Sequence, residues 1–66
     1  MSAADDERLR RLRHDLRSPL VVIGGFAGLL ASERPIEPEQ RRDYAERIKR
    51  AATELERLVA EALARP

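Results

Sequence analysis

The chain has 66 residues, no Cys, one His and 3% aromatic residues, and its charged residues amount to 38% with a formal net charge of +1. A domain of this size needs disulfides, a metal, oligomerisation or very regular helix packing to be stable. The absence of Cys excludes disulfides, and a single His provides no zinc cluster, so no cofactor or metal is expected to bind. The balanced charges and few aromatic rings argue against a nucleic-acid partner.

The N-terminal segment contains acidic residues and lacks the apolar core of a signal peptide. The longest apolar stretch, 19–31, is well short of the ~20 residues that span a bilayer. The sequence therefore predicts no membrane contact by this segment and a cytoplasmic location.

The first predicted helix covers about residues 3–32. Ser2 with Asp5 three residues later resembles a capping box, and Pro35 favours an end just before it. Between these limits, apolar residues recur three or four positions apart, the spacing of a helix that buries one stripe. This stripe comprises Leu9, Leu12, Leu16, Leu20, Ile23, Ala27 and Leu30.

A turn over about 33–37 leads to a second predicted helix over about 38–64. Pro38 suits a first helical turn, and Glu37 and Glu39 complement its dipole. The apolar stripe here comprises Tyr44, Ile48, Ala51, Leu55, Leu58 and Ala62, widened by Val59 and Leu63. Three pairs with the acid four residues before the base, each worth ~0.3 kcal/mol, support the outer face: Asp43–Arg47, Glu46–Arg50 and Glu61–Arg65.

These elements predict an all-α fold with a single domain over 1–66. The short turn makes the two helices antiparallel neighbours in a hairpin. Two helices cannot enclose their own apolar stripes. We therefore expect a homodimer in which two hairpins form a four-helix bundle.

The lone His14 lies almost opposite the apolar stripe at about 100° per residue, so it is expected to face solvent. Alone, an exposed His indicates no function. Its neighbours add weight: Asp15 could orient the imidazole or accept its proton, and Ser18 lies one turn further on the same face. Pro19 removes a helical hydrogen bond at a cost of about 3 kcal/mol. A surface acid, a solvated hydroxyl and a tolerated kink are the alternative interpretations.

Read together, the run His14-Asp15-Leu16-Arg17-Ser18-Pro19-Leu20 resembles the H-box of the histidine kinase dimerisation and phosphotransfer (HisKA, or DHp) domain. All seven positions fit, and the resemblance continues through both helices. It implies that His14 takes the γ-phosphate of ATP and passes it to an Asp of a response-regulator receiver. It also implies an acid/base role for Asp15. Ser18 falls on the family's phosphatase position, where Thr or Asn is usual.

Nothing in the chain resembles the family's ATP-binding domain. Gly24, Gly25 and Gly28 lie within the first helix and form no phosphate-cradling loop. The resemblance therefore implies a part of a histidine protein kinase that is inactive alone. ATP and Mg²⁺ would be supplied through a separate catalytic domain, which becomes a partner of this chain.

The helix after Pro19 is apolar nearly all round, beyond the needs of one core stripe. Exposed apolar surface often marks a partner site, and the family's receiver domain docks beside the phosphoacceptor His. The residues expected in this docking surface are Arg17, Val21, Val22, Gly25, Leu29 and Tyr44. Burial of the same face within the bundle is the alternative.

Two other functions remain open from the sequence. A free-standing phosphotransfer or scaffold protein would share all these features. A purely structural hairpin, or a weak nucleic-acid binder, would use an N-terminal Arg cluster that nearby acids offset: Arg8, Arg10, Arg11 and Arg13.

Overall fold

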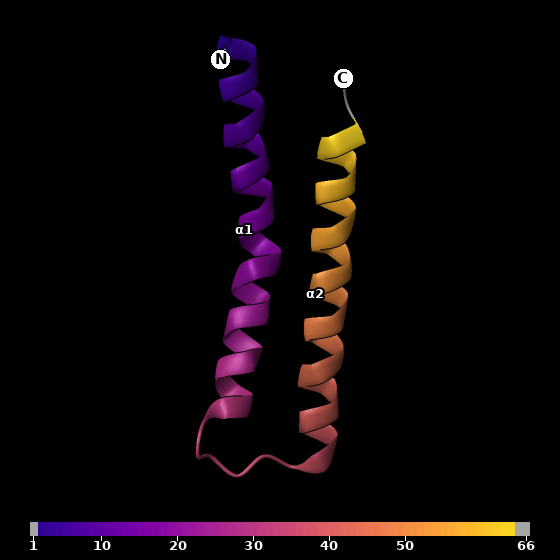
Figure 1. Ribbon diagram of the computed structural model, residues 1–66. Helices are drawn as coiled ribbons and strands as arrows, with labels where there is room; N and C mark the ends of the chain where they lie inside the picture. Colours follow the sequence, from indigo (N-terminus) through magenta and orange to yellow (C-terminus); the bar gives the residue numbers. More distant parts are fainter. Residues whose placement is uncertain (1, 65–66) are drawn as a thin grey trace.

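The computed structural model describes residues 2–64 as two antiparallel helices that lie side by side. Helix α1 spans Ala3–Ala31 and helix α2 spans Pro38–Ala64. The segment 32–37 joins them at one end, and the start of α1 and the end of α2 lie at the other (Figure 1). The predicted all-α hairpin is confirmed, and α1 ends one residue before the expected position.

Side chains cap both helices, and the cap at Ser2 is the one that the sequence predicted. Ser2 precedes α1 in an extended conformation, and its Oγ accepts a hydrogen bond from the Asp5 backbone N–H at 3.2 Å. Ser32 ends the helix, and its hydroxyl donates to the Leu29 carbonyl at 2.8 Å. Before α2, the Glu37 N–H donates to Gln40 Oε1 at 3.3 Å. These bonds satisfy backbone groups that a helix end leaves without partners.

The contact between the helices is centred on Pro19 of α1 and Ala51 of α2, the two buried residues among those described. Helix α1 runs without interruption through Pro19, whose missing N–H leaves the Asp15 carbonyl without its helical donor. On either side of this centre, half-buried residues extend the contact along both helices: Leu12, Leu16, Val22, Ile23, Phe26 and Leu30 from α1, and Tyr44, Ile48, Leu55, Leu58 and Ala62 from α2.

The apolar stripe predicted for the first helix is divided between two faces. Four of its members are half-buried against α2, whereas Leu9, Leu20 and Ala27 are exposed, the two leucines by 52% and 53%. Pro19 and Phe26, which the stripe omitted, take part in the contact instead. Some members of the stripe stay exposed because the stripe is wider than one helix contact, and a single neighbouring helix covers only part of it.

The contact has two flanks. Ser18 and Leu20 are each about 100° from Pro19, in opposite directions around α1. On the side of Ser18, a groove lies between the helices, and Ser18 and Arg50 both line it. We call this side the groove flank. On the other side, exposed apolar residues from both helices form what we call the apolar flank: Leu9, Leu20, Ala27, Val59 and Leu63.

The hairpin is elongated and one helix thick, with Cα extents of 50 × 18 × 11 Å. A layer of this thickness has no interior, and within 2–64 only Pro19 and Ala51 are buried. Neither α1 nor α2 is long and apolar enough to cross a membrane.

Candidate functional site

His14 lies on the exposed surface of α1, away from the contact with α2. It is one turn before Ser18 and five residues before the buried Pro19. Within the described residues, its imidazole makes no hydrogen bond or ion pair. A ring held only by its own helix is accessible to an incoming reactant.

Asp15 and Ser18 face the two grooves that lie between the helices. The upper groove, near the termini, has a volume of about 480 Å³ and includes Asp15 and Glu61 in its lining. The lower groove has a volume of about 350 Å³ and includes Ser18 and Glu54. Asp15 and Ser18 therefore each line one groove, whereas His14, on the same stretch of α1, is exposed and lines neither.

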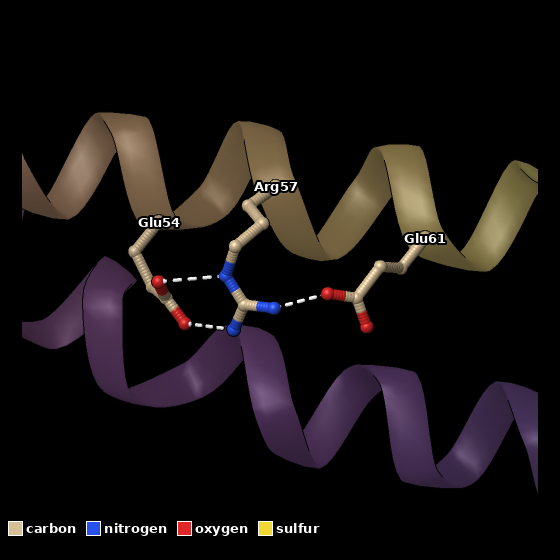
Figure 2. Close-up of polar contacts among 3 residues, drawn as sticks. All are labelled: Glu54, Arg57 and Glu61. Carbon is tan, nitrogen blue, oxygen red and sulfur yellow. Dashed lines mark hydrogen bonds and ion pairs between the residues drawn. The ribbon is translucent and has the colours of Figure 1, made fainter.

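A string of ion pairs on α2 runs alongside this stretch. Arg57 donates two hydrogen bonds to the Glu54 carboxylate, from Nε to Oε2 at 3.1 Å and from Nη2 to Oε1 at 2.5 Å. Its Nη1 donates to Glu61 Oε2, so one guanidinium bridges two carboxylates (Figure 2). Because Glu54 lines the groove of Ser18 and Glu61 that of Asp15, the string lies level with the H-box.

These contacts shift the ionisation of the string. The hydrogen bond from Arg57 lowers the pKa of Glu54, and the two carboxylates raise the pKa of Arg57. All three groups are exposed to water, so their contribution to the stability of the hairpin is small. The two hydrogen bonds from Arg57 favour the ionised form of Glu54 and engage both of its carboxylate oxygens.

Phe26 and Arg47 line the lower groove, and the Arg47 guanidinium lies 5.6 Å from the centroid of the Phe26 ring. Tyr44 lies behind this lining, with its ring centroid 5.2 Å from that of Phe26. Arg47 also pairs with Asp43 at 3.0 Å, as its spacing predicted. The remaining lining residues are Ser18, Pro19, Val22, Arg50, Ala51 and Glu54.

The residues expected in a docking surface lie in different surroundings. Val22 is half-buried in the lower groove, and Tyr44 is half-buried against Phe26. Val21 is 64% exposed, and Leu29 is 37% exposed. Arg17 and Gly25 are also exposed.

Sequence reasoning missed the α2 side of the lower groove. Arg47 and Arg50 were assigned to an outer face with no functional meaning, yet both line the groove beside Ser18. The structure sets the register of the two helices, in which Pro19 packs level with Ala51 and Arg50 lies near Ser18. The predicted Glu46–Arg50 pair is not formed. Arg65 lies outside the described residues, and Glu61 pairs with Arg57.

No His, Cys, Asp and Glu side chains of residues 2–64 gather in a group that could hold a metal ion. The three glycines of α1 have open space where a Cβ would be, and none has a positive φ. The chemistry of the site therefore rests on the imidazole, the adjacent carboxylate and the hydroxyl one turn away.

An exposed His followed by an acid, on an antiparallel helical hairpin, is the arrangement of a phosphoacceptor domain. The family model of the His Kinase A (phospho-acceptor) domain matches residues 5–65. The chain therefore belongs to this family, as its H-box indicated.

Curated relatives support this assignment. The chain is 39% identical over 59 residues to the cell-division control histidine kinase PdhS of Brucella ovis, and equally to those of Brucella suis and Brucella abortus. The match covers 86% of this chain and 6% of each relative. No solved structure matches the chain.

Proposed function

We propose that this chain is the dimerisation and phosphoacceptor module of a two-component sensor histidine kinase. His14 accepts the γ-phosphate of ATP from a separate catalytic domain and passes it to an Asp of a response-regulator receiver. The observation that carries the proposal is the exposed, unpartnered imidazole of His14, next to Asp15, in a chain of the phospho-acceptor family. ATP-dependent signalling of this kind takes place in the cytoplasm, where we place the module.

The chemistry follows from the imidazole. A neutral ring nitrogen attacks the γ-phosphorus, a P–N bond forms, the bond to the bridging oxygen breaks, and ADP leaves. The ring gains positive charge in this step. The Asp15 carboxylate accepts a hydrogen bond or the proton from the ring and stabilises that charge. In the second step the receiver carboxylate attacks the same phosphorus, and neutral His14 leaves.

The direct test is incubation of the full-length protein with ATP, Mg²⁺ and a histidine kinase ATP-binding domain. We expect one phosphoryl group per chain that is labile in acid, as a phosphorus–nitrogen bond is, and mapping by mass spectrometry should place it on His14. A phosphate that is stable in acid, or none, would refute the proposal.

We further propose that two hairpins associate through the apolar flank. In the single hairpin, Leu20 is 53% exposed and Leu63 is 81% exposed. A two-fold partner would cover the same flank in both copies and complete a four-helix bundle. The groove flank, with His14 beside it, would then remain open on each side.

Leu20→Glu is expected to weaken the dimer about 30-fold. Each copy loses roughly 1 kcal/mol from burial of the exposed half of the side chain, and 1.4 kcal/mol corresponds to a factor of ten. The measurement is the dimer dissociation constant by sedimentation equilibrium. Val21→Glu is the matched control, because Val21 is more exposed yet lies about 100° away from Leu20. Equal weakening by both variants would place the interface elsewhere.

We propose that the receiver docks over the groove flank and the turns of α1 after His14. A receiver must bring its Asp to the phosphoryl group, so its footprint includes residues next to His14. Val22 offers apolar contact in the lower groove, and Gly25 leaves the backbone bare beside it. Val21, Leu29 and Arg17 extend this docking surface, with Tyr44 at its α2 side.

Gly25→Leu is expected to reduce phosphotransfer to the receiver at least tenfold, with unchanged labelling of His14. A Cβ at Gly25 meets nothing within 4 Å, so the new side chain projects into the space that the receiver occupies. Helix propensity improves by up to about 1 kcal/mol, so thermal stability is held or raised.

Gly28→Leu is the control for this change. Gly28 also has open space, and it lies nine residues after Pro19, on the side of α1 directly away from α2. It should gain stability equally and transfer phosphate normally. Normal transfer by Gly25→Leu would remove this face from the docking surface.

A further inference from the structure

Arg50 stands at the edge of the lower groove without a carboxylate partner. It is exposed and makes no hydrogen bond or ion pair with the rest of the described chain. Glu46 and Glu54 lie four residues before and after it, the spacing at which charged side chains usually pair. Glu54 is held instead by Arg57, and Glu46 forms no pair. The guanidinium of Arg50 therefore keeps its donors available.

The other charges that line this groove are compensated. Arg47 pairs with Asp43 and lies over the Phe26 ring, and both carboxylate oxygens of Glu54 accept from Arg57. Among the lining residues, a molecule that enters the groove meets one uncompensated charge, on Arg50. It also meets an apolar floor of Pro19, Val22 and Ala51.

We propose that Arg50 is a specificity-determining residue, which selects the phosphate-accepting partner by pairing with a carboxylate on that partner's docking surface. This inference rests on the proposed function. The structure thereby assigns a chemistry to the cognate receiver: it places an apolar side chain against Val22 and Phe26, and an Asp or Glu opposite Arg50.

Charge distribution favours a receiver over a second copy of the chain as the occupant. Leu20, Ala27 and Val59 of the apolar flank line neither groove and carry no charge, and the cores of interfaces between identical chains are depleted in charged residues. The groove flank instead carries Arg47, Arg50 and Glu54. Charges at the rim of an interface mainly set partner choice and association rate, as a transient phosphotransfer complex requires.

The experiment compares Arg50→Glu with Arg42→Glu in the full-length protein. Both change an exposed arginine of α2, and Arg42 lies nine residues before Ala51, on the side away from α1. The probe is the receiver domain that accepts phosphate fastest from the unaltered protein in a panel from the same genome. Four quantities are measured: labelling of His14, transfer rate, its dependence on salt, and dimer dissociation.

We expect Arg50→Glu to slow transfer about five- to tenfold and to make it less sensitive to salt, with labelling and dimerisation unchanged. Arg42→Glu should behave as the unaltered protein. Changing one receiver Asp or Glu to Lys should restore transfer from Arg50→Glu, and should slow transfer from the other two proteins.

Other outcomes identify the other occupants and overturn the inference. Equal transfer by the two variants would show that Arg50 selects nothing. Impaired labelling would assign the groove to the catalytic domain, and altered dissociation would assign it to the second copy. If the unaltered protein is labelled but no receiver accepts its phosphate, the proposed function itself fails.

Discussion

His14→Gln is expected to abolish phosphate acceptance completely. Gln has nearly the reach of His and retains polar atoms, but its amide nitrogen is not a nucleophile. Because His14 is exposed and makes no hydrogen bond or ion pair with other described residues, the fold should be unaffected. Exposed substitutions of this kind usually change stability by less than about 0.5 kcal/mol. The measurement is acid-labile phosphate after incubation with a catalytic domain, ATP and Mg²⁺.

The control for this variant is Arg13→Gln, an equally exposed neighbour on α1. It should be labelled at close to the normal level. Circular dichroism should show the same helicity and melting temperature for both variants. Labelling that survives in His14→Gln would place the acceptor elsewhere, and a much lower melting temperature would show that His14 is structural.

Asp15→Asn should slow phosphorylation of His14 by about 10²- to 10⁴-fold, the usual contribution of a positioned acid or base. Asn is similar in shape, but it neither accepts a proton nor balances the charge that the ring gains. Dimerisation should be unchanged, since Asp15 is exposed at the lining of the upper groove. The rate is measured in single-turnover labelling with saturating ATP.

Asp6→Asn provides the comparison for Asp15→Asn. Asp6 is an exposed acid of the first turn of α1, so its replacement changes the net charge equally at a distance from His14. Its labelling rate should be normal. A normal rate in Asp15→Asn would remove this carboxylate from the mechanism.

The sequence predicted the local elements well because the signals for them are local. Ser2, Ser32 and Pro38 mark helix ends through hydrogen bonds and steric limits that involve only a few neighbouring residues. The short connection then leaves an antiparallel hairpin as the simple arrangement. The H-box is equally local, so the candidate site residues could be named before the fold was known.

The division of the apolar stripe could not be predicted in the same way. Leu16 and Leu20 are alike in sequence pattern, yet one is half-buried against α2 and the other is exposed on the apolar flank. Hydrophobicity indicates that a side chain favours burial, but it does not indicate whether α2 or another surface covers it. Pro19 was considered only for its effect on the helix backbone, and nothing in the sequence indicated that it is buried at the centre of the helix contact.

The spacing rule predicted the Asp43–Arg47 pair, but it could not predict the partner of Glu54. Glu54 had Arg50 four residues before it and Arg57 three residues after it, and it pairs with Arg57. The alternatives differ by only a few tenths of a kcal/mol, which is too little for a spacing rule to decide. The free guanidinium at the lower groove became visible only when both helices were placed together.

The exposure of residues 2–11 at the open end of the hairpin has a consequence for local unfolding. Every residue of this segment is exposed, whereas the buried pair of Pro19 and Ala51 lies further down the hairpin. Opening free energies follow the density of tertiary contacts, so amide hydrogen exchange should be fast near Ser2 and slowest around Ala51. His14 lies between the exposed segment 2–11 and the buried Pro19. A rotation or stretching force applied at the start of α1 would therefore reach the His14 imidazole before it reached the protected region around Pro19 and Ala51.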